Sequence, residues 1–183
     1  MRFYLAVLLA FLVPFLLPVA IQAQQYQVGV SPSVIDIGDV SPGDSKVVKF
    51  YIVTASDIDL LVNLESQKGG IDFFVRDDYR DLIGEYSEQD ASGWLNFVEN
   101  PVELIPGEGQ VKTKGGFITG WREVSFILNV PEYAEPGYHT ITISPKPAAS
   151  GGLGEQQVNI VAIVTTTVLF RVEGDATRNV EIL

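Results

Sequence analysis

The stretch VNIVAIVTTTVLFRV, residues 158–172, contains one charged side chain and neither Gly nor Pro. Most of its residues are β-branched, which favours a strand. Both of its alternating faces are largely apolar, unlike the faces of a half-buried strand. A straight strand of this length would extend roughly 50 Å, well beyond the usual length. We therefore expect the segment to bend, to bulge or to pair with different neighbours along its two halves.

Exposed at the edge of a sheet, so apolar a segment would pair with other chains. In one arrangement, neighbouring strands of the same chain bury it. In another, part of it accepts a strand from another subunit. The strand-pairing edge would then comprise Val164, Thr166, Val168 and Phe170. The composition favours burial and leaves strand exchange open.

The rest of the chain is a succession of short segments in which apolar and polar residues alternate. In IDLLVNLE, residues 58–65, every second side chain is apolar, as is typical of a half-buried strand. The pattern recurs in VSFILNV at 124–130 and in YHTITIS at 138–144. The stretch SPGDS at 41–45 predicts a turn, because Pro fixes φ and Gly tolerates a positive φ.

About eight to ten such strands, separated by Pro and Gly turns and without intervening helices, predict an all-β fold. We expect antiparallel sheets stacked as a β-sandwich over residues 24–183. Two segments interrupt the pattern. Residues 72–93 are acidic and rich in Tyr and are expected to form a long connection with one helical turn around 80–86. Residues 146–156, KPAASGGLGEQ, are expected to form a flexible surface loop.

The N-terminus has the pattern of a signal peptide. Met1 and Arg2 precede an uncharged apolar run at residues 3–21. Small residues at Ala20 and Ala23 would permit cleavage after residue 23, so we assign residues 1–23 to the signal peptide. The run is also long enough to span a bilayer as an uncleaved anchor. Either alternative places the rest of the chain in the extracellular space or the cell envelope.

Charge and composition exclude several classes of function. The chain has a net charge of −11 and no Cys. Such an acidic protein repels nucleic acids and anionic lipid surfaces. Without Cys it forms no disulfide and no thiolate metal site. Nucleic-acid binding and thiol chemistry are therefore excluded.

The sequence contains no constellation that predicts catalysis. The single histidine, His139, lies among alternating apolar residues, so we interpret it as a side chain at the rim of the core. No Ser lies in a G-x-S-x-G context, and one histidine cannot form an imidazole metal site. The glycines match neither a phosphate-binding loop nor a dinucleotide motif. We expect no enzyme and no cofactor.

The acidic segment holds the candidate binding residues. Asp77, Asp78 and Asp81 offer the oxygen ligands that calcium takes, although their spacing does not match an EF-hand, and a solvated loop is the favoured interpretation. Tyr79, Tyr86 and Trp94 are candidate contacts for a carbohydrate or protein ligand. Trp94 and Trp121 are also candidates for the core or its rim, and this second interpretation is the favoured one.

Four stretches carry a resemblance to exported immunoglobulin-like domains of bacterial and archaeal surface proteins. They are residues 30–56, residues 95–108, VSFILNVPEYAEPGYHTITISPKP at 124–147, and TTTVLFRVEG at 165–174. The turn with Pro131, Ala134, Pro136 and Gly137 is similar to one that recurs in such modules before a strand. The chain resembles the N-terminal domain of PapD-type pilus chaperones and the peptidoglycan-binding domain of WxL-type surface proteins.

The resemblance implies an immunoglobulin-like antiparallel β-sandwich whose last strand pairs with clients. In pilus chaperones a basic pair binds the carboxylate of the pilus subunit. The matching positions in this chain hold Val34 and Val168, so the resemblance does not extend to that carboxylate clamp.

We therefore expect an exported, non-enzymatic structural or binding module of the cell envelope. Its expected partners are other envelope proteins or a cell-surface polymer, with self-association by strand pairing also open. The alternative is a subunit or chaperone-like protein that acts by β-strand addition in a surface filament.

Overall fold

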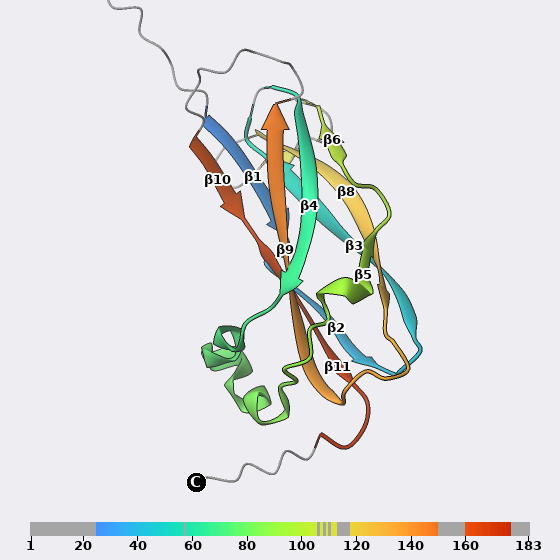
Figure 1. Cartoon of the computed structure of the whole chain (residues 1–183). Helices are drawn as coiled ribbons and strands as arrows, with labels where there is room; N and C mark the ends of the chain where they lie inside the picture. Colours follow the sequence, from blue (N-terminus) through green and yellow to red (C-terminus); the bar gives the residue numbers. More distant parts are fainter. Residues whose placement is uncertain are drawn as a thin grey trace, which may run out of the picture.

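The computed structural model describes residues 25–56, 58–105, 107, 109, 111–112, 118–149 and 160–176. Strands dominate these ranges (Figure 1). The strands are β1 Gln25–Ser31, β2 Val34–Val40, β3 Ser45–Thr54, β4 Leu60–Lys68, β5 Leu95–Phe97, β6 Val102–Leu104, β7 Val111–Lys112, β8 Ile118–Asn129, β9 Gly137–Ala149, β10 Ile160–Val164 and β11 Thr166–Val172. The same described ranges contain three short 3₁₀ helices: η2 Ile71–Val75, η3 Asp77–Glu85 and η4 Ser92–Trp94.

The strands form two sheets that pack face to face. Sheet A has the order β10-β1-β3-β8-β5, with β7 paired to β8, and sheet B has the order β2-β11-β9-β4-β6. Alternate residues of both sheets point inward and build one core, whose fully buried members include Phe50, Ile52, Phe126, Leu128, Ile141, Ile143, Val168 and Phe170. The all-β sandwich predicted from the alternation is confirmed.

The segment 158–172 divides between the two sheets. Its first half, β10, pairs with β1 in sheet A, and its second half, β11, pairs with β2 and β9 in sheet B. The expectation that its halves have different neighbours is confirmed. The pairs β1–β10 and β2–β11 are parallel, whereas the sequence predicted antiparallel pairing throughout.

The N-terminal segment that pairs with residues 160–172 changes sheets at the same level, between β1 and β2. Between β1 and β2, Pro32 lacks a backbone N–H and cannot continue a ladder. The Thr166 hydroxyl donates a hydrogen bond to the Pro32 carbonyl oxygen over 2.7 Å, and the Thr167 N–H donates to the Ser33 carbonyl oxygen over 3.1 Å. Two adjacent chain segments therefore cross from one sheet to the other together.

The acidic segment 72–93 exposes its carboxylates as predicted, but it also covers part of sheet B with buried aromatic side chains, which the sequence did not predict. Phe73, Phe74 and Tyr86 pack with Leu169 of β11 in a second apolar cluster outside the main core. Figure 1 shows η2 and η3 as the green coils beside the lower ends of β4, β9 and β11. This cover, which we call the acidic cap (residues 71–87), explains why β11 is apolar on both faces. The helical turn expected around residues 80–86 lies largely within η3.

Two other boundaries differ from the sequence-based expectations or lie beyond the described residues. The strand β9 continues to Ala149, paired with Leu60 of β4, so the first four residues of the expected loop at 146–156 are strand. Residues 150–159 and the signal peptide assigned to residues 1–23 lie outside the described residues. Within the ranges given above, no helix has the length and hydropathy needed to cross a bilayer.

Shortening Leu169 tests the burial of the outer face of β11. Leu169 is 2% exposed beneath the acidic cap, so Leu169→Ala is expected to lower the free energy of unfolding by about 2–5 kcal/mol. Ile163→Ala is the matched control, since Ile163 is 44% exposed on β10. Urea unfolding measures both, and equal costs for the two variants would contradict the cap.

Candidate interaction surface

Among the described strands, β10 forms a sheet edge that is paired on one side only. It stands at the end of sheet A (Figure 1) and pairs with β1 on one side, with no second partner among the described strands. Its sequence, IVAIV, contains no charge and no Pro. Ile163 is 44% exposed and Val164 is 57% exposed. Natural proteins usually blunt such edges with Lys, Pro or a bulge, so an edge without these features is a candidate for contact with another chain.

An apolar row extends from this edge across the outer face of sheet A. The strand registers place Val164 opposite Gly29, Gly29 opposite Val53, and Val53 opposite Trp121. Gly29 has no side chain, and a Cβ there would lie 3.3 Å from the Val164 Cβ. A groove of about 220 Å³ lies along the first part of this row, lined by Gln27, Val28, Gly29, Val53, Thr54, Ala55 and Val164.

Only one of the four predicted edge residues lies at an edge. Thr166, Val168 and Phe170 belong to β11, which pairs on both sides, and they are 1%, 0% and 0% exposed. The prediction is wrong for these three residues because the chain changes sheets at Thr165. Val164 precedes the change and remains on the open edge.

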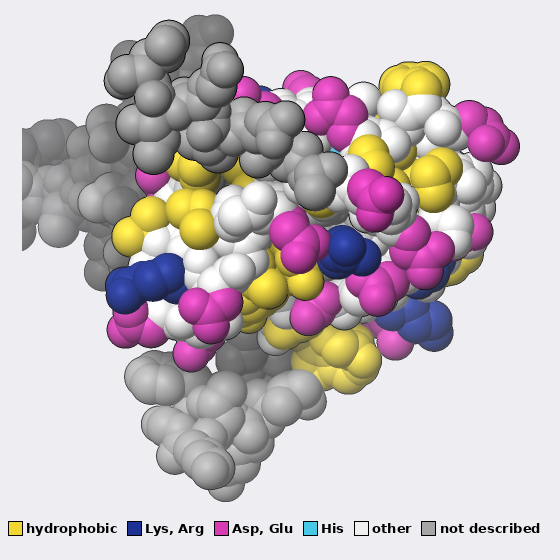
Figure 2. Space-filling model, turned by 90° about the horizontal axis from the view of Figure 1, so that it is seen from below, with side chains coloured by type: hydrophobic (Ala, Val, Ile, Leu, Met, Phe, Trp, Pro, Cys, Tyr) yellow, Lys and Arg dark blue, Asp and Glu magenta, His cyan; other side chains and the backbone are white. Residues whose placement is uncertain are grey.

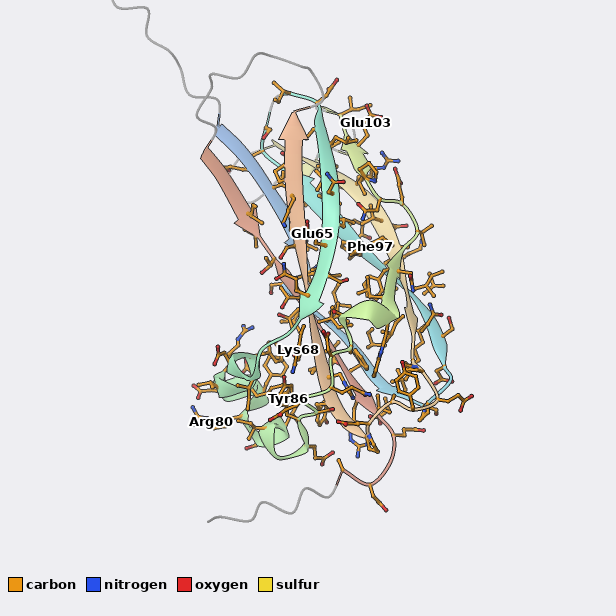
Figure 3. The ribbon with its side chains drawn as sticks, viewed as in Figure 1. Glu65, Lys68, Arg80, Tyr86, Phe97 and Glu103 are labelled. Carbon is orange, nitrogen blue, oxygen red and sulfur yellow. The ribbon has the colours of Figure 1, made fainter. Side chains whose placement is uncertain are left out.

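The aromatic residues of the acidic segment are mostly buried. Trp94 is 8% exposed and packs against both His139 and Phe170, with ring centroids 5.1 and 6.1 Å away. Tyr86 is 5% exposed and lies 5.0 Å from the ring of Phe74. Figure 3 labels Tyr86 where the acidic cap meets the sheet. Their assignment as exposed ligand contacts is therefore wrong, and the alternative placement of Trp94 in the core is correct.

Tyr79 is half-buried. Its ring lies 4.4 Å from the ring of Phe73, and the guanidinium of Arg76 lies 5.8 Å from its centroid. The ring thus forms the outer layer of the cap and retains some exposed surface.

The acidic side chains of η3 point into solvent. Asp77, Asp78 and Asp81 are exposed, and Asp77 pairs with Arg80 over 2.8 Å. Among the described residues, no group of three or more His, Asp or Glu side chains is arranged to hold a metal ion. Calcium binding by these residues stays a prediction. Figure 2, a view onto this end of the molecule, shows more acidic than basic side chains across it.

His139 belongs to the core. It is 1% exposed and stacks on Phe170 with an interplanar angle of 8°. Its Nε2 lies 2.8 Å from the carbonyl oxygen of Glu135. A carbonyl only accepts hydrogen bonds, so Nε2 carries the hydrogen. The sequence predicted a side chain at the rim of the core, and the structure buries the imidazole within it.

One ion pair joins the acidic cap to β11. The Arg171 Nε donates a hydrogen bond to the Glu85 carboxylate over 2.9 Å. Tyr138 of β9 lies beside this pair. Burial first, and the Glu85 carboxylate second, raise the pKa of Tyr138 above its usual value.

The order of the strands decides the fold. The strands β3 and β8 form a central antiparallel pair in sheet A, and β4 and β9 form one in sheet B. The first two and the last two described strands are divided between the sheets, with β1 and β10 in sheet A and β2 and β11 in sheet B. The fold is an immunoglobulin-like β-sandwich.

Comparisons with known proteins found similar solved structures but no similar sequence. No family model matches the sequence, and no curated protein matches it. Similar solved structures include a PapD-like domain of human CEP192, with 10% identity and a TM-score of 0.46 over 81% of this chain and 86% of that one. Another is the E. coli chaperone DraB, with 11% identity and a TM-score of 0.45. The match covers 85% of this chain and 58% of DraB.

A third similar structure is a family 123 glycoside hydrolase from Clostridium perfringens. It has 13% identity and a TM-score of 0.43 over 78% of this chain and 23% of the hydrolase. These likenesses concern the fold alone.

Sequence reasoning missed the apolar residues on the outer face of sheet A. Tyr51, Val53 and Trp121 lie on this face. In a half-buried strand that alternates apolar and polar residues, the outer face is expected to carry polar side chains. The available signal was the run Val47, Lys49, Tyr51 and Val53, in which three of four outward positions are apolar.

The raised pKa of Tyr138 predicts how stability changes in alkali. A raised pKa means that the folded chain holds the phenol proton more tightly than the unfolded chain does. This stabilisation is complete below pH 10.0, the usual pKa, and is lost as the pH rises through the folded pKa. In Tyr138→Phe, we expect the free energy of unfolding to fall less steeply above pH 10.0 than in the wild type. Urea unfolding at a series of pH values measures both slopes, and identical slopes would contradict the assignment.

Proposed function

We propose that the chain is an exported, non-enzymatic binding module of the cell envelope that holds a protein partner by strand addition at β10. The observation that carries the proposal is the open, uncharged edge of β10 with Ile163 and Val164 exposed. A strand edge offers backbone N–H and C=O groups to an extended peptide, and its side chains add selectivity. Export is supported by the apolar run at residues 3–21.

The immediate surroundings of the edge suit an extended apolar segment. The groove beside Gly29 continues the exposed surface of Val164 onto sheet A. A partner strand laid along β10 would place every second side chain on this face of the sheet. The partner would then bury apolar surface in addition to forming backbone hydrogen bonds.

Charge selects among partners. The chain carries a net charge of −11, which opposes close approach of a second copy or of another acidic protein. The edge itself is uncharged. A partner segment in which apolar and polar residues alternate, and which contains no acidic side chain, fits both conditions. We therefore propose that the partner is such a segment of a different protein.

A lysine on the edge tests strand addition. The probe is a synthetic peptide that alternates Val and Thr and ends in Lys, and binding is followed by fluorescence anisotropy. Val164→Lys is expected to weaken binding at least about ten-fold, or 1.4 kcal/mol, because a charge blunts a pairing edge. The matched control is Val47→Lys, which adds the same charge at a position 67% exposed on the outer face of β3.

Three outcomes would overturn the proposal. They are no binding of the peptide by the wild type, equal loss in Val164→Lys and Val47→Lys, and a concentration-dependent dimer that Val164→Lys abolishes. The last result, from sedimentation equilibrium, would identify a second copy as the occupant of the edge.

A further inference from the structure

The upper half of β9 is a second sheet edge on the side of the sandwich that carries β10. The strand β11 pairs with β9 from Gly137 to Ile143, whereas β9 continues beside β4 to Ala149. Over residues 144–149, which we call the β9 edge, the side of the strand away from β4 has no partner among the described strands. Figure 1 shows this part of β9 rising beyond β11. The strand that precedes β11 lies in sheet A as β10 and does not extend sheet B.

The exposure of Ile163 shows how far sheet B reaches at this level. The β1–β10 register places Ile163 beside Val28, which is 2% exposed in the core, so both side chains point to the inner face of sheet A. Ile163 is nevertheless 44% exposed. The described part of sheet B therefore does not cover Ile163, and two strand edges, β10 and the β9 edge, lie on the same side of the sandwich.

Hydrogen bonds determine which backbone groups of β9 face this side. The Gly69 N–H, directly after β4, donates to the Thr140 carbonyl oxygen over 2.9 Å. The β4–β9 register continues from there without a shift. Opposite residues in an antiparallel pair alternate between bonded and non-bonded, so the odd-numbered residues of β9 direct their backbone groups away from β4. Leu64, opposite Pro145, agrees with this, because its N–H donates to the Asn100 side chain over 2.9 Å.

The β9 edge has prolines at two of its three outward-directed positions. These positions are Pro145, Pro147 and Ala149. Proline has no backbone N–H, and prolines within sheets lie where the missing donor would face away from the ladder. A strand laid along this edge would therefore find two of the three donors absent. The same prolines leave the ladder with β4 intact, because that ladder uses the even-numbered residues.

Other edges of the two sheets are protected by different features. The strand β2 contains Asp36 and Asp39, and its register against β11 shifts at a bulge. The strands β5 and β6 have three residues each. Charges, bulges and short edge strands all discourage pairing with another chain. Compared with β2, β5, β6 and the β9 edge, β10 has none of these features in its described sequence IVAIV.

We propose that Pro145 and Pro147 prevent the β9 edge from accepting a strand. With an N–H at both positions, this edge would add an extended segment of another chain to sheet B. The two prolines thus determine which of the two neighbouring sheets is closed to a partner strand. The block acts on sheet B and does not depend on whether β10 accepts a strand.

Restoring the two amides tests the block in a chain whose β10 edge is closed by Val164→Lys. The probe is the peptide that alternates Val and Thr and ends in Lys, and fluorescence anisotropy follows its binding. Val164→Lys/Pro145→Val/Pro147→Val is expected to bind the peptide at least about ten-fold more tightly than Val164→Lys does, or 1.4 kcal/mol. Val favours a strand and returns both missing donors. Because β10 is closed in both chains, failure of strand addition at β10 in the wild type would not affect this comparison.

Lys146→Val in the same Val164→Lys background is the matched control. It adds an apolar strand-forming side chain at an exposed position of β9 but no N–H on the open side, so its affinity should equal that of Val164→Lys. Pro147→Val alone restores one amide at a half-buried position and should give a smaller gain, which provides the test if the buried Pro145 does not tolerate replacement. The proposal is overturned if neither proline variant gains affinity, or if Lys146→Val gains as much as they do.

Discussion

At Pro32 and Thr165, two neighbouring segments leave sheet A and enter sheet B, held together by the hydrogen bond from the Thr166 hydroxyl to the Pro32 carbonyl oxygen. This crossing allows one apolar segment to serve both layers of the sandwich. The C-terminal half becomes an inner strand between β2 and β9. The N-terminal half becomes the last strand of sheet A. The same crossing thus produces a strand that is paired on both sides and a strand that stands at the end of a sheet.

The two faces of β11 are buried in different ways. Val168 and Phe170 point into the main core, whereas Leu169 is covered by the aromatic side chains of the acidic cap. The cap presents its carboxylates to solvent, so a segment of acidic composition still covers apolar surface. The ion pair between Arg171 and Glu85 fastens this cap to the strand beneath it.

The sequence predicted the sandwich because short strands with period-2 alternation leave few other solutions. It also predicted that residues 158–172 bend, bulge or pair with different neighbours along their two halves, since a straight strand of that length is rare, and the last of these is observed. It did not locate the crossing, because Thr165 is followed by two more Thr residues and does not differ from them in the sequence. The crossing is recognised only from the hydrogen bond between Thr166 and Pro32. Three of the four predicted edge residues were therefore misplaced.

The candidate binding residues were harder to predict. Tyr86 and Trp94 lie in a polar stretch that reads as a surface loop, yet long-range contacts with Phe74 and Phe170 bury them. Trp121 was interpreted as core or rim, and it lies half-buried on the outer face of sheet A, with its ring against Tyr51 of the neighbouring strand. Such proximity between distant segments leaves no periodic signal in the sequence.

Native-state amide hydrogen exchange tests the crossing most directly, because it compares β10 and β11 residue by residue. The structure predicts that the amides of Leu169 and Phe170 exchange only through global unfolding. It also predicts that alternate amides of β10, those directed away from β1, exchange much faster. Uniform protection from residue 160 to residue 172 would show one continuous inner strand and would contradict the account.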